Sequence, residues 1–205
     1  MNKNIFYPTE AINSGFPKCV VQGFKTPRQD KSEIDCFICS AASDLTVKPT
    51  IVLLDGSGGR SVFTREIHDG RERFYSPFLF SSLEKYIDEW NMVVFQKRGV
   101  YFNETKGDTD VSSEFKANYN FRQRIKDTDS VIEYLYRQEV CKDKPLLLIG
   151  HSEGSSVAPG VAVINKRVTH LGLLGFGVGH GLLDCLFNLR KDLHAGIINE
   201  DVFNE

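Results

Sequence analysis

The run Leu146–Gly154 (LLLIGHSEG) joins four consecutive apolar residues to the pattern glycine-x-serine-x-glycine. Residues 155–164, which follow it, are compatible with a helix despite Pro159. A strand that is apolar on both faces is typical of a parallel sheet covered on both sides. The run therefore predicts a buried strand, a tight turn at residues 150–154 and a helix.

The same alternation of strand and helix extends outward along the chain. Apolar runs predict strands at residues 34–40, 49–54, 92–95 and 168–174, and helices are predicted at about 77–87 and from 119 onward. This order predicts an α/β fold with a mostly parallel sheet and helices on both faces. Ligands of such sheets bind at the carboxyl ends of strands, so the turns after Leu54, Ile149 and Leu174 are the expected location of a site.

Three regions are expected along the chain. Residues 1–33 contain three prolines and no sustained period, so they are expected to form an N-terminal extension with one short strand. Residues 34–180 are expected to form the α/β core, and residues 181–205 an amphipathic helical segment. The charged stretch 65–73 and the polar stretch 101–118 are expected to be exposed loops.

The composition is that of an ordinary globular protein. The chain has 205 residues, 25 Lys and Arg against 27 Asp and Glu, and a net charge of −2. A charge this close to zero gives no general attraction to nucleic acid or to an anionic membrane, so neither is expected as a partner. No apolar run approaches the roughly 18 residues of a membrane helix, and the N-terminus lacks the apolar block of a secretory signal. We therefore expect a cytoplasmic protein.

The five cysteines form no paired framework. Cys36 and Cys39 make a CxxC pattern, but no second CxxC or HxxxH completes a zinc site. Both residues fall within a predicted strand, where positions three apart face opposite sides. The cysteines are therefore expected to be small buried side chains, and no metal is expected.

The pattern Gly150-x-Ser152-x-Gly154 matches the nucleophile elbow of serine hydrolases. Such a site needs a hydroxyl at the tip of a sharp strand-to-helix turn, where the flanking glycines leave room for the backbone. The start of the following helix directs backbone N–H groups toward developing negative charge. The alternative is a glycine-rich turn with an incidental serine, but the predicted strand before it and helix after it favour the elbow.

Acyl transfer also needs two N–H donors that converge on one oxyanion. The backbone N–H of Glu153, next to the candidate nucleophile, is expected to be one of them. The loop Asp55–Gly59 (DGSGG) follows an earlier strand and is placed to supply the other, with Ser57 as the first choice and Gly58 as the second. A phosphate-binding loop is excluded because no Gly-Lys-Ser/Thr follows these glycines.

Four segments between about Lys48 and Gly179 resemble the α/β-hydrolase fold family of serine esterases and peptidases. They are LLDGSGG (53–59), VVFQKRGV (93–100), LLLIGHSEGS (146–155) and VTHLGLLGFG (168–177). The resemblance implies that the backbone amides of Ser57 and Glu153 stabilise the oxyanion, and that Ser152 forms an acyl intermediate with a small-molecule ester or peptide-like substrate. It implies no cofactor. Supporting roles are implied for Gly56, Gly58, Gly150, His151 and Gly154.

The sequence departs from the family pattern in two loops. Asp55 stands where the family usually has histidine, and Gln96 where an aspartate often precedes the arginine-glycine pair. Both departures concern the support of loops and leave the serine itself unchanged.

The catalytic acid and base of the family follow the serine, after further strands that this sequence lacks. The segment from Gly181 resembles the start of a lid helix, so the fold is expected to be incomplete at its C-terminal end, with an exposed sheet edge that favours self-association. Three hypotheses remain open. The chain is a fragment of a larger serine hydrolase; or Asp184, with His180 or His194, completes a compact site; or the chain is a non-catalytic binding or remnant protein. His151 is expected to support the oxyanion loop, and His170 to be structural.

Overall fold

The computed structural model describes residues 7–9, 12, 16, 18–42, 45–68, 71–77, 79–101, 111–175 and 196. Residues 1–174 form one compact unit and residues 175–205 a second one. Of the second unit only Gly175 and Gly196 are described, so the expected lid segment 181–205 lies outside the described residues.

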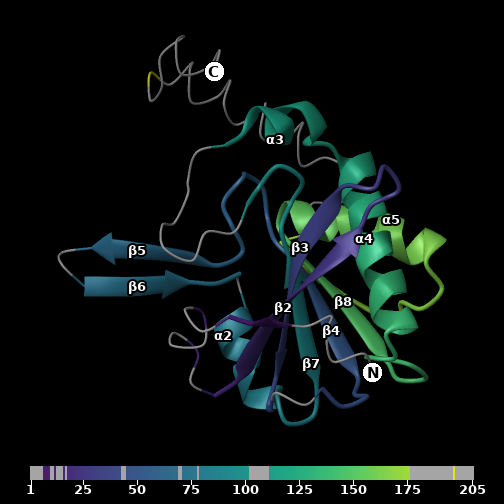
Figure 1. The fold of residues 1–205 in the computed structure, drawn as a ribbon. Helices are drawn as coiled ribbons and strands as arrows, with labels where there is room; N and C mark the ends of the chain where they lie inside the picture. The colour runs from purple at the N-terminus through teal and green to yellow at the C-terminus, as the bar shows by residue number, and fades with distance from the viewer. Residues whose placement is uncertain are drawn as a thin grey trace. The chain divides into compact units, whose positions relative to one another are not determined.

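The described part of the chain contains a seven-stranded sheet in the order β1-β2-β3-β7-β4-β8-β9 (Figure 1). Its strands are β1 (Tyr7–Pro8), β2 (Val20–Pro27), β3 (Glu33–Ser40), β7 (Asn91–Phe95), β4 (Thr50–Leu54), β8 (Leu146–His151) and β9 (His170–Leu174). The four strands from β7 to β9 run parallel to one another, and β3 joins them as an antiparallel neighbour of β7. The predicted α/β fold with a mostly parallel sheet is therefore confirmed.

Helices connect the parallel strands. They are α2 (Phe80–Leu83), the 3-10 turn η1 (Glu84–Tyr86), α3 (Ser113–Asn118), α4 (Phe121–Arg137) and α5 (Glu153–Ile164). The side chains of Ser112 and Asn120 cap α3 and α4, because each accepts a hydrogen bond from a backbone N–H three residues later. None of the described helices combines the length and apolar character that a membrane span requires.

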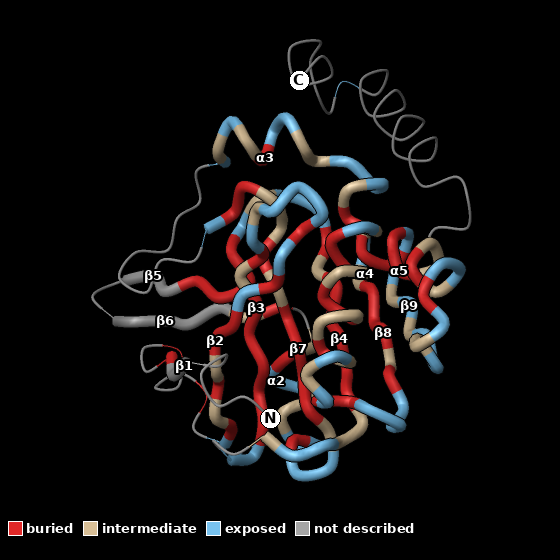
Figure 2. Tube along the Cα trace, turned by 45° about the vertical axis from the view of Figure 1, so that its right-hand side comes forward, coloured by how far each residue is buried: buried red, intermediate tan, exposed pale blue. Residues whose placement is uncertain are grey.

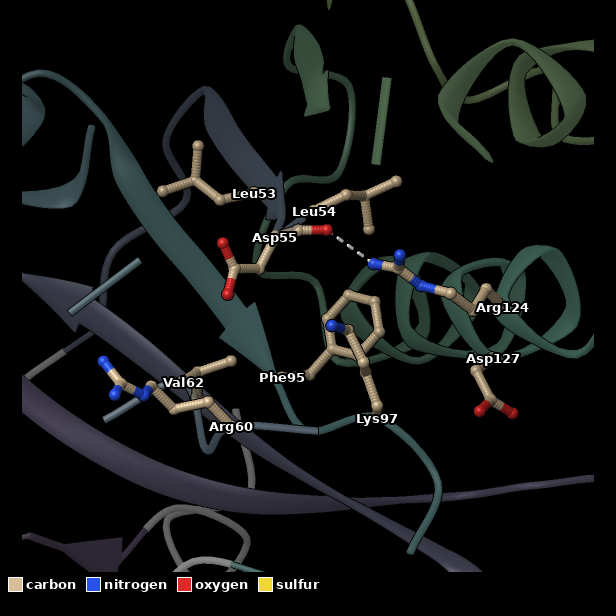
Figure 3. A pocket seen from close by; sticks show the side chains of 9 residues that line it. All are labelled: Leu53, Leu54, Asp55, Arg60, Val62, Phe95, Lys97, Arg124 and Asp127. Carbon is tan, nitrogen blue, oxygen red and sulfur yellow. Dashed lines mark hydrogen bonds between the residues drawn. The ribbon is translucent and has the colours of Figure 1, made fainter. Parts of the chain in front are cut away.

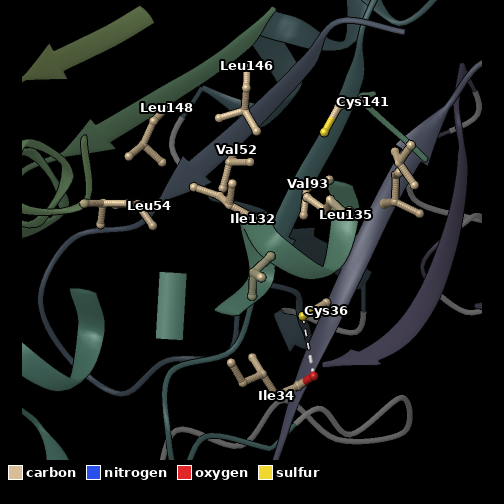
Figure 4. Close-up of a cluster of buried hydrophobic side chains, with 14 of the residues drawn as sticks. Ile34, Cys36, Val52, Leu54, Val93, Ile132, Leu135, Cys141, Leu146 and Leu148 are labelled. Carbon is tan, nitrogen blue, oxygen red and sulfur yellow. Dashed lines mark hydrogen bonds between the residues drawn. The ribbon is translucent and has the colours of Figure 1, made fainter. Parts of the chain in front are cut away.

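The sheet is covered on both faces, as its apolar strands predict. Along β4, Val52 and Leu54 pack against α4 and α5 on one face, while Ile51 and Leu53 face the opposite cluster, which includes Phe63 and Phe80. Figure 4 shows the first of these clusters, and Figure 2 shows buried residues along the central strands with exposed residues on the outer surfaces of the helices. The parallel strands, at whose carboxyl ends a site is expected, are thus held by packing on both faces of the sheet.

Cys36 and Cys39 are divided between these two faces. Cys36 belongs to the cluster under α4 and α5, and Cys39 to the cluster on the opposite face. Both thiols are free and buried, and burial raises the pKa of each. The prediction of small buried side chains is confirmed for both residues.

Residues 1–33 contribute more to the sheet than the expected extension with one short strand. The eight residues of β2 pair with β3 along their full length, from Val20 opposite Ser40 to Pro27 opposite Glu33. Val21 and Phe24 are completely buried by this pairing. Strand formation here depends on burial and on the partner strand, which outweigh the weak local pattern.

Two stretches that were expected to be loops contain regular structure. Part of the charged stretch 65–73 forms the hairpin of β5 (Thr64–His68) and β6 (Arg71–Tyr75), whose main chains pair over five residues each. In the polar stretch 101–118, α3 occupies residues 113–118, and residues 102–110 lie outside the described part. Backbone pairing and the Ser112 cap provide hydrogen bonds that charge patterning alone does not reveal.

Candidate active site

Ser152 lies at the sharp turn between β8 and α5, where the sequence places it. Its backbone angles are φ 51° and ψ −121°, a combination that side-chain-bearing residues rarely adopt. The turn is held by a hydrogen bond of 2.8 Å from the Ser152 amide to the carbonyl oxygen of Leu174 in β9. Ser152 is exposed, so its hydroxyl is accessible at the carboxyl end of the parallel strands.

The two glycines that flank Ser152 are required by close backbone packing. A Cβ atom on Gly150 would lie 2.2 Å from the carbonyl oxygen of Gly154. A Cβ atom on Gly154 would lie 2.4 Å from the carbonyl oxygen of Leu54. The turn therefore needs glycine at both positions, for the steric reason that the sequence pattern suggests.

The loop Asp55–Gly59 lies against Ser152 because β4 and β8 are parallel neighbours whose ends coincide, with Leu54 opposite Gly150. A Cβ atom on Gly56 would lie 3.2 Å from Ser152 Cβ and 3.6 Å from Ser152 Oγ. Gly56 is buried, whereas Ser57 and Gly58 are exposed. The structure thus brings the candidate oxyanion loop and the candidate nucleophile together.

Arg124 in α4 connects this loop to the residue that follows Ser152. Its Nη1 donates to Glu153 Oε1 at 2.8 Å, and its Nη2 donates to the carbonyl oxygen of Asp55 at 2.8 Å. Figure 3 shows the guanidinium extending from the helix toward Asp55. Both partners of the ion pair between Arg124 and Glu153 are largely buried, with side-chain exposures of 10% and 17%. The bridge fixes the start of α5 relative to the end of β4.

Tyr119 makes a second connection. Its hydroxyl donates to Glu153 Oε2 and accepts a hydrogen bond of 3.0 Å from the Gly58 amide. Burial, followed by the hydrogen bond to Glu153, raises the pKa of Tyr119 to about 12, so the hydroxyl keeps its proton. Because the Gly58 amide is already donated to Tyr119, Ser57 is the better candidate for the loop's oxyanion donor.

Lys97 lies directly after β7, on the other side of the loop from Ser152. Its Nζ donates to the carbonyl oxygens of Gly56 and Gly58, and it lies 5.8 Å from the centre of the Tyr119 ring. Burial, followed by repulsion from Arg124, lowers the pKa of Lys97 to about 8. Lys97 thus holds two carbonyl groups of the glycine loop.

Lys97, Tyr119 and Arg124 are residues of the site that no sequence motif indicates. Lys97 follows the carboxyl end of a predicted strand, and that position was the available signal for it. Tyr119, in the link between α3 and α4, and Arg124, in α4, reach the loop through tertiary packing, for which the sequence carries no local signal.

Gln96, one of the two departures from the family pattern, supports the chain that follows the loop. Its Nε2 donates to Ser61 Oγ at 2.5 Å, and its Oε1 accepts from the Val62 amide at 3.1 Å. A neutral amide both donates and accepts here, which a carboxylate cannot do. The side chain is buried, and the substitution keeps its polar atoms satisfied.

A cavity of about 20 Å³ lies at the carboxyl ends of β4 and β7, next to the start of the glycine loop. Figure 3 shows its lining: Leu53, Leu54, Asp55, Arg60, Val62, Phe95, Lys97, Arg124 and Asp127. This volume holds about one water molecule. The cavity is therefore too small for an organic ligand, and Ser152 is not among the residues that line it.

Of the histidines in the sequence, His151 and His170 have side chains that the structure describes, whereas the side chain of His68 in β5 lies outside the described part. His151 is adjacent to Ser152, and its Nδ1 lies 3.6 Å from the Cβ position of Gly56, which is consistent with support of the loop. His170 begins β9, four residues before Leu174, which places it about 13 Å down the strand from the site. Asp184, His180 and His194 lie outside the described residues. Among the residues that are described, no group of three or more metal-ligating side chains is present.

The fold is similar to those of solved hydrolase structures. A cold-adapted esterase from an Arctic intertidal metagenomic library is 15% identical over 84% of this chain and 67% of its own length, with a TM-score of 0.52. A thermostable carboxyl esterase from Bacillus coagulans is 14% identical over 86% of this chain and 51% of its own, with a TM-score of 0.51. Oligopeptidase B from Leishmania major is 16% identical over 74% of this chain, with a TM-score of 0.53.

This chain spans about two thirds, one half and one fifth of the lengths of those three proteins. No protein-family model and no curated protein sequence matches it. At these identities the likeness is one of backbone fold.

Proposed function

We propose that this chain, which has the α/β-hydrolase fold, is a serine hydrolase that cleaves a carboxylic ester or an amide through an acyl-serine intermediate at Ser152. The observation that carries the proposal is the backbone of Ser152, an exposed serine at φ 51° between a parallel strand and the start of a helix. Such strained conformations persist only where the surroundings impose them, and they cluster at active sites.

The geometry supports a specific course for the reaction. Ser152 Oγ attacks the substrate carbonyl carbon and loses its proton to a general base, and the carbonyl oxygen becomes an oxyanion. The backbone amides of Glu153 and Ser57 stabilise that charge. The bond to the leaving alkoxide or amine then breaks as the base returns the proton to it, and water releases the acyl group by the same steps.

The amide of Glu153 is suited to this role by its position. It is the first N–H of α5 and has no carbonyl partner within the helix. The aligned peptide dipoles of the helix add a partial positive charge at the same point. A developing oxyanion beside Ser152 Oγ therefore meets a donor that is already oriented, at no further cost in reorganisation.

The similar structures support both classes of substrate. Two of them are described as esterases, and one is an oligopeptidase. Ester and peptide bonds are cleaved by the same acyl-serine chemistry. We therefore propose a small-molecule ester or a peptide-like substrate.

A fluorophosphonate probe tests the proposal, because it forms a covalent bond only with an activated serine. We expect labelling of the wild-type chain that is lost in Ser152→Ala. Ser156→Ala is the matched control, since Ser156 is an exposed serine in the same helix, and it is expected to label as the wild type does. Labelling that persists in Ser152→Ala, or a folded wild-type chain that is not labelled, would overturn the proposal and favour a non-catalytic protein.

A further inference from the structure

We propose that Lys97 is a positioning residue of the oxyanion hole: by holding the Gly56 carbonyl, it turns the Ser57 amide toward the reacting atoms. The inference rests on the proposed function of Ser152 and adds to it the element that orients the second donor. It follows from three observations: the direction of one peptide unit, the order of the strands, and the connections of Glu153.

The carbonyl of Gly56 and the N–H of Ser57 belong to the same peptide unit. In a trans peptide these two groups point in opposite directions, and the described residues contain no cis peptide bond. Because Lys97 Nζ holds the Gly56 carbonyl, the Ser57 N–H must point away from Lys97. One ammonium group therefore sets the direction of this amide.

The strand order determines what lies on that opposite side. β4 lies between β7 and β8, so the loop after β4 lies between Lys97, which follows β7, and Ser152, which follows β8. Gly56 lies next to Ser152, since a Cβ atom added to Gly56 would lie 3.2 Å from Ser152 Cβ. An amide that points away from Lys97 therefore points toward Ser152, where the oxyanion forms.

The same group of side chains also fixes the other donor. Lys97 holds the Gly58 carbonyl, and Tyr119 accepts the Gly58 amide while donating to the Glu153 carboxylate. Arg124 joins that carboxylate to the Asp55 carbonyl. Glu153 is itself the residue whose backbone amide is the first donor. The residues that carry the two amides are therefore linked through these side chains.

Among the side chains that hold the glycine loop, we expect Lys97 to change its charge as pH rises. Burial lowers its pKa to about 8, and the groups that face it are Asp55 after β4, Tyr119 between α3 and α4, Arg124 in α4, and Glu153 at the start of α5. Arg124 opposes the charge, whereas Asp55 and Glu153 favour it. A charged donor makes a hydrogen bond roughly twice as strong as a neutral one. We therefore expect the loop to lose its anchor, and Ser152 its reactivity, as pH rises through about 8.

The experiment measures the second-order rate of Ser152 labelling by a fluorophosphonate between pH 6 and 10. Lys97→Met is expected to lower the rate about tenfold or more at pH 7, because a donor displaced by an ångström loses much of its effect. Lys97→Arg keeps its charge throughout this range and is expected to remove the decline above pH 8. Lys85→Met is the matched control, since Lys85 is an exposed lysine that also lies over a tyrosine ring, at 4.9 Å from that of Tyr86.

The outcomes separate this inference from the proposed function. A wild-type chain that is not labelled overturns the function of Ser152. A labelled wild type with a Lys97→Met variant that reacts at the same rate and with the same pH profile overturns the role of Lys97 alone. If Lys97→Met does not fold, as judged by thermal unfolding, Lys97→Arg decides the matter, because a decline above pH 8 that persists in it contradicts the inference.

Discussion

The α-carbon of Gly154 faces the carbonyl oxygen of Leu54 so closely that a Cβ atom would lie 2.4 Å from that oxygen. This contact sets the separation between the start of α5 and the end of β4. The first of these elements carries Ser152 and Glu153, and the second leads into the glycine loop. The relative position of the two proposed oxyanion donors, Glu153 and Ser57, therefore depends on residue 154 having no side chain.

Gly154→Ala should consequently reduce both stability and reactivity. The added methyl meets backbone, which cannot move without shifting a strand, and overpacking of this kind costs about 1–3 kcal/mol. Urea unfolding measures the loss, and fluorophosphonate labelling is expected to slow in the same variant. Gly160→Ala in the same helix is the control, because its Cβ would meet the flexible end of Ile125. If both variants unfold at the same urea concentration, the contact with Leu54 does not constrain the turn.

Ser152→Gly should stabilise the chain while abolishing labelling. A residue with a side chain at φ 51° and ψ −121° carries about 1–3 kcal/mol of backbone strain, which glycine relieves. Glycine also adds flexibility to the unfolded chain, so the expected net gain is about 1 kcal/mol in the free energy of unfolding. Ser152→Ala keeps the Cβ atom and is expected to leave stability near that of the wild type. Equal stabilities of the glycine and alanine variants would show that the turn is not strained.

The ends of the parallel strands and the turn at Ser152 could be predicted because they depend on local pattern. An apolar run, followed by a serine with a glycine two residues before it and another two residues after it, is sufficient to place Ser152 at the carboxyl end of a parallel strand. β2 could not be predicted in the same way, because Val21 and Phe24 are buried by a partner strand rather than marked by alternation. Strand preference reflects such packing more than the backbone's own tendency.

The same distinction between local pattern and tertiary packing applies to the residues of the candidate site. Ser57 and Glu153 are adjacent in sequence to features with a clear pattern, so their positions could be predicted. Arg124 in α4, and Tyr119 in the link that precedes α4, contact the glycine loop only because of the position at which α4 packs against the sheet. A helical period shows which face of α4 is buried, but it does not show which loop that face meets.

Lys97 should also make stability depend on pH. Its pKa is about 8 in the folded chain and near the ordinary 10.5 in the unfolded chain. Between these values the unfolded chain binds more protons, so the free energy of unfolding rises with pH, by at most about 1.4 kcal/mol per pH unit. Urea unfolding at pH 7 and pH 9.5 should show this gain in the wild type and in Lys85→Met but not in Lys97→Met. Parallel pH dependence in all three chains would mean that burial does not lower the pKa of Lys97.

The buried ion pair of Arg28 and Asp127 ties the β2–β3 turn to α4, one helical turn beyond Arg124. Arg28 Nε lies 2.9 Å from Asp127 Oδ1, and each side chain is only 6% exposed. Arg28→Met would leave the carboxylate buried with Gln123 as its donor, at a cost of about 3–5 kcal/mol in the free energy of unfolding. Lys142→Met, which breaks an exposed pair with Glu139, is the control and should cost less than about 1 kcal/mol.

The pH dependence of that cost tests its cause. Burial raises the pKa of Asp127 even with Arg28 present, and removal of the guanidinium should raise it further. A carboxyl whose folded pKa exceeds its unfolded value contributes stability at low pH that is lost as pH rises. The cost of Arg28→Met should therefore be smaller at pH 4.5 than at pH 7, as measured by urea unfolding. A cost that is the same at both pH values would indicate lost packing of the arginine side chain, and not an uncompensated buried charge.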